Sequence, residues 1–151
     1  NEYHKEKQTS VVFQFLPQVK KDKIIKLFKS DRKDCAHGDQ KRDFVYVKDC
    51  VSFMEHLMLT KPKSGLYNCG TGTARSFNEL AKSVFEAMGE KKPKIEYIDM
   101  PAALKGQYQY FTEADHNKII DDAKYTKKFT PIEEGVKEYI REYLLAEDSY
   151  L

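Results

Sequence analysis

Arg42 is a side chain that could bind an anionic ligand. It comes directly before the apolar run of residues 44–47, which predicts a short strand, and it follows a charged stretch without periodicity. A guanidinium group at the mouth of a strand can present a planar pair of donors to two phosphate oxygens. The alternative is an ion pair at the surface with Asp43 or Asp49. The residue types at this position therefore allow a phosphate site without requiring one.

Tyr108 is a second candidate ligand-binding side chain. It lies in the irregular, glycine-containing stretch LKGQYQ of residues 104–109. A tyrosine in such a loop either points its hydroxyl at a ligand or closes the edge of the core with its ring. Lys5, by contrast, is one of many lysines, and composition alone predicts an ordinary surface residue.

The stretch Gly70–Thr71–Gly72 invites comparison with a dinucleotide-binding loop, because it follows a predicted strand and precedes a predicted helix. The full pattern needs a third glycine for close packing of the helix on the strand, and Arg75 occupies that position. We therefore predict a tight turn into a capped helix, with no cofactor at this loop.

The cysteines indicate neither disulfides nor a metal centre. Cys35, Cys50 and Cys69 are odd in number and form no C-x-x-C pair, which is typical of free thiols in a reducing compartment. The spacing Cys35-x-His37 lacks a second ligand pair nearby at zinc-like spacing. We expect free thiols, no metal and a cytoplasmic location.

Composition excludes several classes of partner. The chain has 151 residues with a formal net charge of only +2, and 33% of its residues are charged. A nucleic-acid or membrane surface needs a concentrated basic field, so neither is an expected partner. No apolar run approaches the roughly 20 residues of a membrane span. The chain opens on Asn1 instead of methionine, and one hypothesis is that it is a piece of a longer protein.

The pattern of apolar residues predicts an α/β fold. Short β-prone runs alternate with helical periodicity, Ser76 and Glu79 have capping-box spacing, and Thr130–Pro131 predicts a helix start. The predicted strands are 24–28, 44–47, 66–69 and 94–98, and the predicted helices are 9–22, 49–61, 76–88, 113–123 and 130–147. Few and short strands cannot form a parallel sheet covered on both faces. We expect a lobe that completes a larger sheet elsewhere.

Four stretches resemble a known family. RDFVYVKD (residues 42–49) and GLYNCGTGTARSFNELA (65–81) are typical of extended short-chain dehydrogenase/reductases that act on nucleotide sugars. NEYHKEKQTSVVFQ (1–14) and LKGQYQYFTEADHNKI (104–119) are similar to the ADP-L-glycero-D-manno-heptose 6-epimerase family. The resemblance covers nearly the whole chain. It implies that the chain corresponds to the C-terminal, substrate-binding half of such an enzyme. The absent N-terminal Rossmann half would hold the glycine-rich NADP loop and a Tyr-x-x-x-Lys pair.

The resemblance also implies roles for particular residues. Lys5 matches the second catalytic acid/base, which also contacts the cofactor, and Glu6 replaces the family glycine beside it. Arg42 and Tyr108 match substrate ligands, with Asp43 and Asp49 holding the basic side chains in place and capping the next helix. The remaining positions that match substrate-binding residues are Phe28, Lys29, Ser30, Asp31, Gln14 and Lys7. Gln14 and Lys7 replace a histidine and a serine of the family.

The reaction implied by the resemblance inverts the configuration at carbon 6 of ADP-heptose, for synthesis of the lipopolysaccharide core. NADP would remove and return a hydride, with Lys5 and a tyrosine of the absent half exchanging protons on opposite faces. Lys5 would need a pKa near about 7–8, through burial and a cationic neighbour such as Lys7, yet we expect it exposed in this chain. The family also implies a homo-oligomer, with a pentamer as one candidate. The alternatives are another nucleotide-sugar epimerase or dehydratase and a non-catalytic nucleotide-sugar-binding module.

Overall fold

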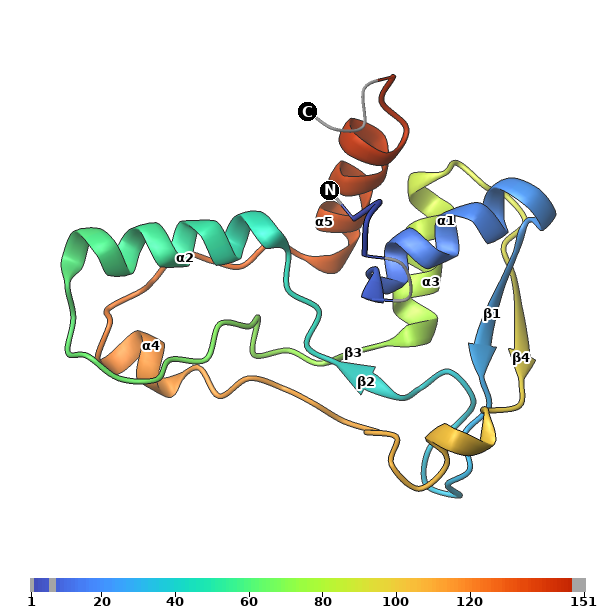
Figure 1. Ribbon diagram of the computed structural model, residues 1–151, viewed down its shortest axis with the longest axis horizontal. Coiled ribbons are helices and arrows are strands. Elements are labelled where there is room, and N and C mark those ends of the chain that lie inside the picture. Colours follow the sequence, from blue (N-terminus) through green and yellow to red (C-terminus); the bar gives the residue numbers. More distant parts are fainter. Residues whose placement is uncertain (1, 6–7, 148–151) are drawn as a thin grey trace.

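The computed structural model describes residues 2–5 and 8–147 and has the expected α/β composition (Figure 1). The elements in chain order are α1 (Val11–Asp22), β1 (Ile24–Phe28), β2 (Lys41–Arg42), α2 (Val47–Thr60), β3 (Arg75–Ser76), α3 (Phe77–Ala87), β4 (Lys94–Ile98), the 3-10 helix η2 (Ala102–Leu104), α4 (Asn117–Asp121), α5 (Ile132–Glu138) and the π-helix η3 (Tyr139–Leu144). Within the described residues, no helix combines the length and the apolar character that crossing a bilayer would need.

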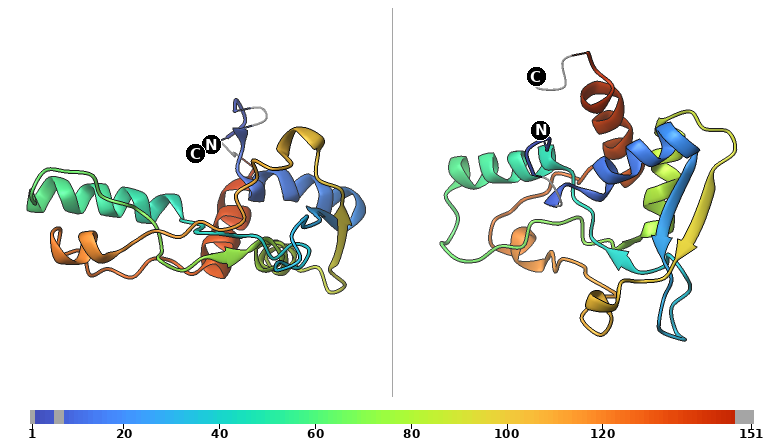
Figure 2. Two further views of the ribbon diagram at one scale, coloured as in Figure 1. Left: turned by 90° about the horizontal axis from the view of Figure 1, so that it is seen from below. Right: turned by 45° about the vertical axis from the view of Figure 1, so that its right-hand side comes forward.

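Two small sheets organise the chain. β1 and β4 pair in parallel, with a register that runs from Ile24 opposite Lys94 to Phe28 opposite Ile98. β2 and β3 pair antiparallel, which places Arg42 opposite Arg75. Helices α1 and α3 lie beside the first sheet, and α5 packs on α3 (Figures 1 and 2). The predicted strands 24–28 and 94–98 are therefore confirmed.

The main core lies between these helices and β1. Its largest fully buried side chains include Ile25, Leu80, Phe85 and Ile140, contributed by β1, α3 and η3. Each buried side chain of this size contributes about 1.5–3 kcal/mol through the hydrophobic effect. This packing fixes the end of β1 relative to the start of α3.

A second, smaller cluster lies away from this core. It consists of Phe53 on α2 with Ile119, Ala123 and Tyr125, which belong to α4 and the residues that follow it. In both figures, α2 and α4 form an arm that extends from the body made by α1, α3 and α5 (Figures 1 and 2).

Two predicted strands do not form. Residues 44–46 are irregular and α2 begins at Val47, so pairing stops at Arg42. The physical reason is Asp43, whose carboxylate accepts hydrogen bonds from another loop and turns the chain out of the sheet. Residues 66–69 also lack regular structure.

Two predicted helices begin later than expected. The helix predicted from residue 113 reduces to α4, because the backbone N–H of Ala114 is donated to Asp43. The last helix begins at Ile132 with Pro131 at its N-cap, whereas Thr130 was expected there. Thr130 instead donates its backbone N–H and its hydroxyl to Asp49, at 2.8 and 2.9 Å.

The capping box at the start of α3 is confirmed. The Ser76 hydroxyl accepts from the Glu79 N–H at 3.1 Å, and the Glu79 carboxylate accepts from the Ser76 N–H at 2.7 Å. We expect Ser76→Ala to lower the free energy of unfolding by about 1 kcal/mol, because one N–H at the helix start loses its acceptor. Urea denaturation checks this, with the exposed turn residue Ser64→Ala as the control. An unchanged midpoint for Ser76→Ala would contradict it.

Candidate functional site

Arg42 lies against aromatic rings and forms no ion pair. Its guanidinium carbon is 5.2 Å from the centroid of the Tyr108 ring and 5.9 Å from that of Phe77. Its Nη1 donates to the backbone carbonyl of Lys41 at 2.7 Å. Among the described residues, Arg42 appears in none of the ion pairs. The alternative of a surface pair with Asp43 or Asp49 is therefore wrong, and so is the idea that these acids hold the basic side chains.

Tyr108 is half-buried, and its ring packs at the edge of the core, which is one of the two roles considered for it. Its ring packs edge-on against Phe28, with centroids 6.3 Å apart, and against Tyr110 at 5.8 Å. Burial raises the pKa of the Tyr108 phenol, and the positive charge of Arg42 partly offsets that effect. The side chain therefore stays a neutral hydrogen-bonding group at the edge of a cavity.

That cavity has a volume of about 920 Å³. Gln14, Phe28 and Tyr108 line it, together with Gln40. Its size suits a nucleotide-scale ligand. Three of the predicted substrate-binding residues thus share one cavity, and Arg42 contacts one of them.

Gln40 is a cavity residue that sequence reasoning missed. Its side chain is only 1% exposed, and its Nε2 donates to the Phe28 carbonyl at 3.4 Å. The sequence offered no signal for it, because Gln40 lies outside both the strand predicted at residues 44–47 and the observed β2.

The loop after β1 is tied to neighbouring segments by hydrogen bonds. The Lys29 ammonium pairs with Asp99 at 3.0 Å, and the Ser30 N–H donates to the ring of His37 at 3.0 Å. The Asp31 N–H donates to the Tyr110 hydroxyl at 2.9 Å. These bonds hold residues 29–31 near the Tyr108 segment, with the side chain of Asp31 exposed.

Lys5 lies beside a neighbouring cavity. The residue is exposed, as expected, and it lines a hollow of about 560 Å³ together with Asp43 and Tyr139. Val11 lines both this hollow and the one beside Tyr108. Lys5 and Tyr108 therefore line two different cavities that share Val11, and Arg42 is in the lining of neither. Lys7 lies outside the described residues.

Asp43 joins three segments beside these cavities. Its carboxylate accepts from the N–H and hydroxyl of Thr71, from the N–H of Gly72 and from the N–H of Ala114, at 2.6 to 3.0 Å. Burial alone would raise the pKa of the Asp43 carboxyl group, but these hydrogen bonds together hold that pKa below its usual value. A Cβ at Gly70 would lie 2.7 Å from this carboxylate, which explains the first glycine of the stretch.

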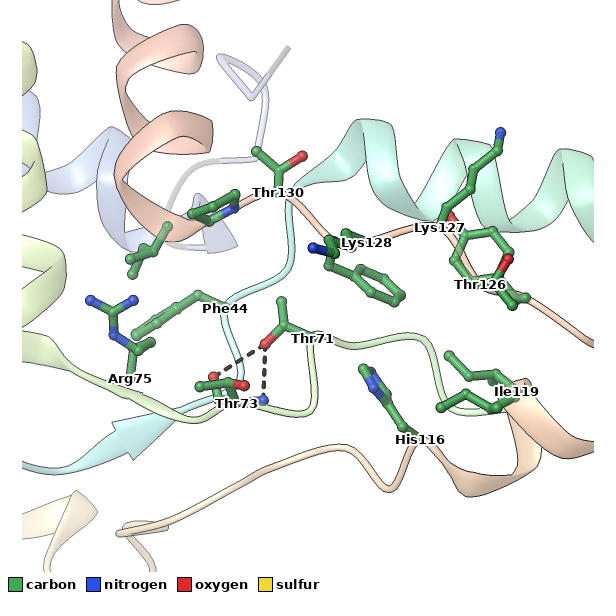
Figure 3. A pocket seen from close by; sticks show the side chains of 15 residues that line it. Phe44, Thr71, Thr73, Arg75, His116, Ile119, Thr126, Lys127, Lys128 and Thr130 are labelled. Carbon is green, nitrogen blue, oxygen red and sulfur yellow. Dashed lines mark hydrogen bonds between the residues drawn. The ribbon is translucent and has the colours of Figure 1, made fainter.

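A third cavity, of about 520 Å³, was not predicted from the sequence (Figure 3). Phe44, Arg75 and His116 line it with several threonines and lysines. Arg75 is already neutralised by ion pairs with Glu79 and Glu133, at 2.9 and 2.5 Å. The charge of Arg75 is therefore compensated within the chain, while Lys127 and Lys128 line the same cavity without an ion pair among the described residues.

Two of the three thiols lie together, because the side chain of Cys50 is hydrogen-bonded to that of Cys69. Cys35, Cys50 and Cys69 are free, as predicted. Within residues 2–5 and 8–147, no group of three or more histidine, cysteine or acidic side chains could hold a metal ion.

Comparison with known proteins shows what the chain is similar to. The profile of the NAD dependent epimerase/dehydratase family matches residues 1–70. The chain is 47% identical over all 151 residues to an ADP-L-glycero-D-manno-heptose-6-epimerase from Nitratidesulfovibrio vulgaris strain DP4, covering 46% of that protein. The chain is similar to these epimerases over its whole length. An enzyme of the same name from Fusobacterium nucleatum is 46% identical over 99% of this chain and 46% of its own length.

Solved structures agree with this relationship. The ADP-L-glycero-D-manno-heptose-6-epimerase of Helicobacter pylori superposes with a TM-score of 0.74 at 33% identity, over 93% of this chain and 40% of that one. A UDP-glucose 4-epimerase from Thermotoga maritima gives a TM-score of 0.67 at 27% identity, over 89% and 40%. The chain thus has the fold of this epimerase family and spans less than half the length of its curated relatives.

Proposed function

We propose that this chain is the substrate-binding part of an enzyme that epimerises ADP-D-glycero-D-manno-heptose at carbon 6. The observation that carries the proposal is the contact of Arg42 with Tyr108 beside the cavity that Phe28 and Gln14 line. The reaction in this proposal is taken from the names of the relatives. More than half of the length of these relatives is not matched by this chain, and we propose that the unmatched part corresponds to a Rossmann domain before residue 1.

Each of these residues has a chemical role in the proposal. The Arg42 guanidinium binds the diphosphate, because its fork matches two phosphate oxygens. Phe28 and Tyr108 form aromatic walls, and the Tyr108 hydroxyl donates to the sugar-nucleotide. Lys29, Ser30 and Asp31 border the nucleotide. Gln14 faces the same cavity, and Lys7 is assigned near the sugar by its sequence position alone.

Lys5 is the second of the two proton-transferring side chains in this proposal. Inversion of a carbon needs one proton donor or acceptor on each face, and Lys5 takes the face opposite the tyrosine of the Rossmann domain. Its side chain is exposed in this chain, and in the proposal the two domains bury it when they close over the substrate.

A nicotinamide cofactor is part of the proposal, with NADP as the form favoured. When bound, such a cofactor would supply reversible hydride transfer at carbon 6. The family is described as NAD dependent, and an enzyme from Bordetella bronchiseptica, 25% identical to this chain, was solved with NAD+. The exposed Lys5 ammonium fits as a donor to such a cofactor. The backbone N–H groups of Thr71 and Gly72 do not, because Asp43 already accepts them.

The cellular setting belongs to the same proposal. ADP-heptose is used to build the lipopolysaccharide core, and nucleotide sugars are made in the cytoplasm, so we place the enzyme there. We also propose that it assembles as a homo-oligomer, with a pentamer as the favoured form. Neither a nucleic acid nor a membrane is a partner.

The test uses a fused protein in which the unmatched part of the Nitratidesulfovibrio vulgaris relative precedes residue 1. We expect the fused protein with NADP to convert the D-glycero epimer of ADP-heptose and to leave UDP- and GDP-sugars unchanged. The 151-residue chain alone should show no turnover. Conversion of UDP-glucose instead would favour a 4-epimerase. Turnover by the isolated chain would contradict the assignment of a missing cofactor domain.

A further inference from the structure

The turn that carries Lys5 is held through its backbone. The Lys5 N–H donates to the Glu2 carbonyl at 3.0 Å, and Tyr3 packs edge-on against Phe13 of α1, with ring centroids 5.2 Å apart. We call residues 2–5 the Lys5 turn. The side chain of Lys5 is exposed and takes part in none of the ion pairs among the described residues. The place of its ammonium group therefore depends on how this turn is fixed.

The Glu2 side chain ties the Lys5 turn to two other parts of the chain. Its Oε1 accepts from the Tyr139 hydroxyl at 2.6 Å, a contact between residues 137 positions apart. Its Oε2 accepts from the N–H of Ser10, the N-cap of α1, at 2.5 Å. Glu2, Ser10 and Tyr139 line the same cavity of about 560 Å³ as Lys5. The attachment of the turn and the residue that it carries therefore border one cavity.

Charge strengthens the contact between Glu2 and Tyr139. Burial alone would raise the pKa of the Glu2 carboxyl group, but the hydrogen bonds from Tyr139 and Ser10 and the positive charge of Lys5 together hold that pKa below its usual value. Burial and the bond to Glu2 raise the pKa of the Tyr139 phenol. At neutral pH a neutral donor therefore meets a charged acceptor, and such a hydrogen bond is stronger than one between two neutral groups.

Tyr139 belongs to a firmly packed element. It is the first residue of the π-helix η3, a rare conformation that frequently occurs at functional sites. The next residue, Ile140, is fully buried in the main core, and Leu144 at the other end of η3 is buried there too. The Tyr139 hydroxyl therefore offers the Lys5 turn a rigid point of attachment.

We propose that Glu2 and Tyr139 are positioning residues for Lys5. Their hydrogen bond fixes the Lys5 turn against η3 and so holds the Lys5 ammonium group at the cavity. This inference rests on the proposed function, in which Lys5 transfers a proton. Misplacement of a reacting group by about 1 Å can cost about 100-fold in rate, so a fixed turn matters for that step. The alternative is a contact that only stabilises the fold.

The first measurement follows the backbone of the 15N-labelled chain by NMR relaxation. We expect the amides of Tyr3 and Lys5 to be ordered, with order parameters near about 0.85, and Tyr139→Phe should lower them below about 0.6. Tyr143→Phe is the matched control, because this hydroxyl on the same helix bonds to Lys48 instead, and both amides should stay ordered. Mobile amides in the native chain, or equal effects of the two variants, would overturn the inference.

The second measurement is the epimerisation rate of the fused protein. Tyr139→Phe and Glu2→Ala should each lower the maximal rate about 10- to 100-fold and change the KM for ADP-heptose by less than about threefold. In the background of Lys5→Met, Tyr139→Phe should lower the remaining rate by less than about twofold, because the side chain that it positions is gone. A contact that only stabilises the fold would lower the rate equally with or without Lys5, and that result would overturn the inference.

The two measurements separate this inference from the proposed function. Release of the Lys5 turn by Tyr139→Phe, in a protein whose fused form has no epimerase activity, would support the contact that holds Lys5 and count against the proposed function. Epimerase activity that Tyr139→Phe and Glu2→Ala leave unchanged would support the proposed function and overturn the inference.

Discussion

Replacing Lys5 by methionine is expected to lower the epimerisation rate of the fused protein by about 100- to 10,000-fold, the usual contribution of a positioned general acid or base. Methionine keeps the length and apolar body of the side chain but can neither donate nor accept a proton. The rate is measured by following conversion between the two epimers of ADP-heptose. The exposed Lys20 on α1 provides a matched control as Lys20→Met, which should leave the rate within about twofold.

A binding measurement separates chemistry from substrate affinity in this variant. Lys5 lines a cavity adjoining the one beside Tyr108, so Lys5→Met should change the affinity for ADP by less than about threefold. A large loss of ADP affinity with an unchanged maximal rate would move Lys5 from proton transfer to nucleotide binding.

Replacing Asp43 by asparagine should destabilise the isolated chain by about 2–4 kcal/mol, because it disturbs two or more of the four hydrogen bonds to the carboxylate. The amide is nearly the same shape, but its NH2 group would face N–H donors. Urea denaturation at neutral pH measures the loss. The exposed Asp121 supplies the control as Asp121→Asn, which should change the free energy by less than about 0.5 kcal/mol.

The effect of Asp43 should depend on pH in a defined direction. The pKa of this carboxyl group is lower in the folded chain than its usual value. Its contribution is therefore fully present above the unfolded pKa of about 3.9 and is lost as the pH falls through the folded value. The difference in stability between the native chain and Asp43→Asn should shrink below about pH 4. A difference that stays constant down to pH 2 would exclude the carboxylate as its source.

Local signals in the sequence predicted those elements that local chemistry determines. The capping box of Ser76 and Glu79 formed as its spacing indicates, and β1 and β4 formed where apolar, β-prone residues concentrate. The strand expected at residues 44–47 failed because Asp43 bonds to loops 28 and 71 residues later in the chain. No local pattern shows a bond between such distant residues.

The candidate site shows the same limit. Arg42 and Tyr108 were singled out by type and by resemblance, but their contact joins β2 to a loop 66 residues later. Gln40 was overlooked because a buried glutamine looks like an ordinary loop residue until the cavity is known. Helical spacing on α2 predicts one face made of Val51, Met54, Leu57 and Met58, but Leu57 packs against the cluster of Phe53 while the other three side chains are more than half exposed.

The most direct test of the site is a titration of the 15N-labelled chain with ADP-heptose, followed by NMR. We expect the amide signals of residues 28–31, Arg42 and Tyr108 to shift together and to saturate with one dissociation constant. Arg42→Lys should weaken that constant by about tenfold, because an ammonium group cannot replace the two parallel bonds of a guanidinium. Shifts confined to the cavity of Arg75 and His116, or no shifts at millimolar ligand, would contradict a nucleotide-sugar site between Arg42 and Tyr108.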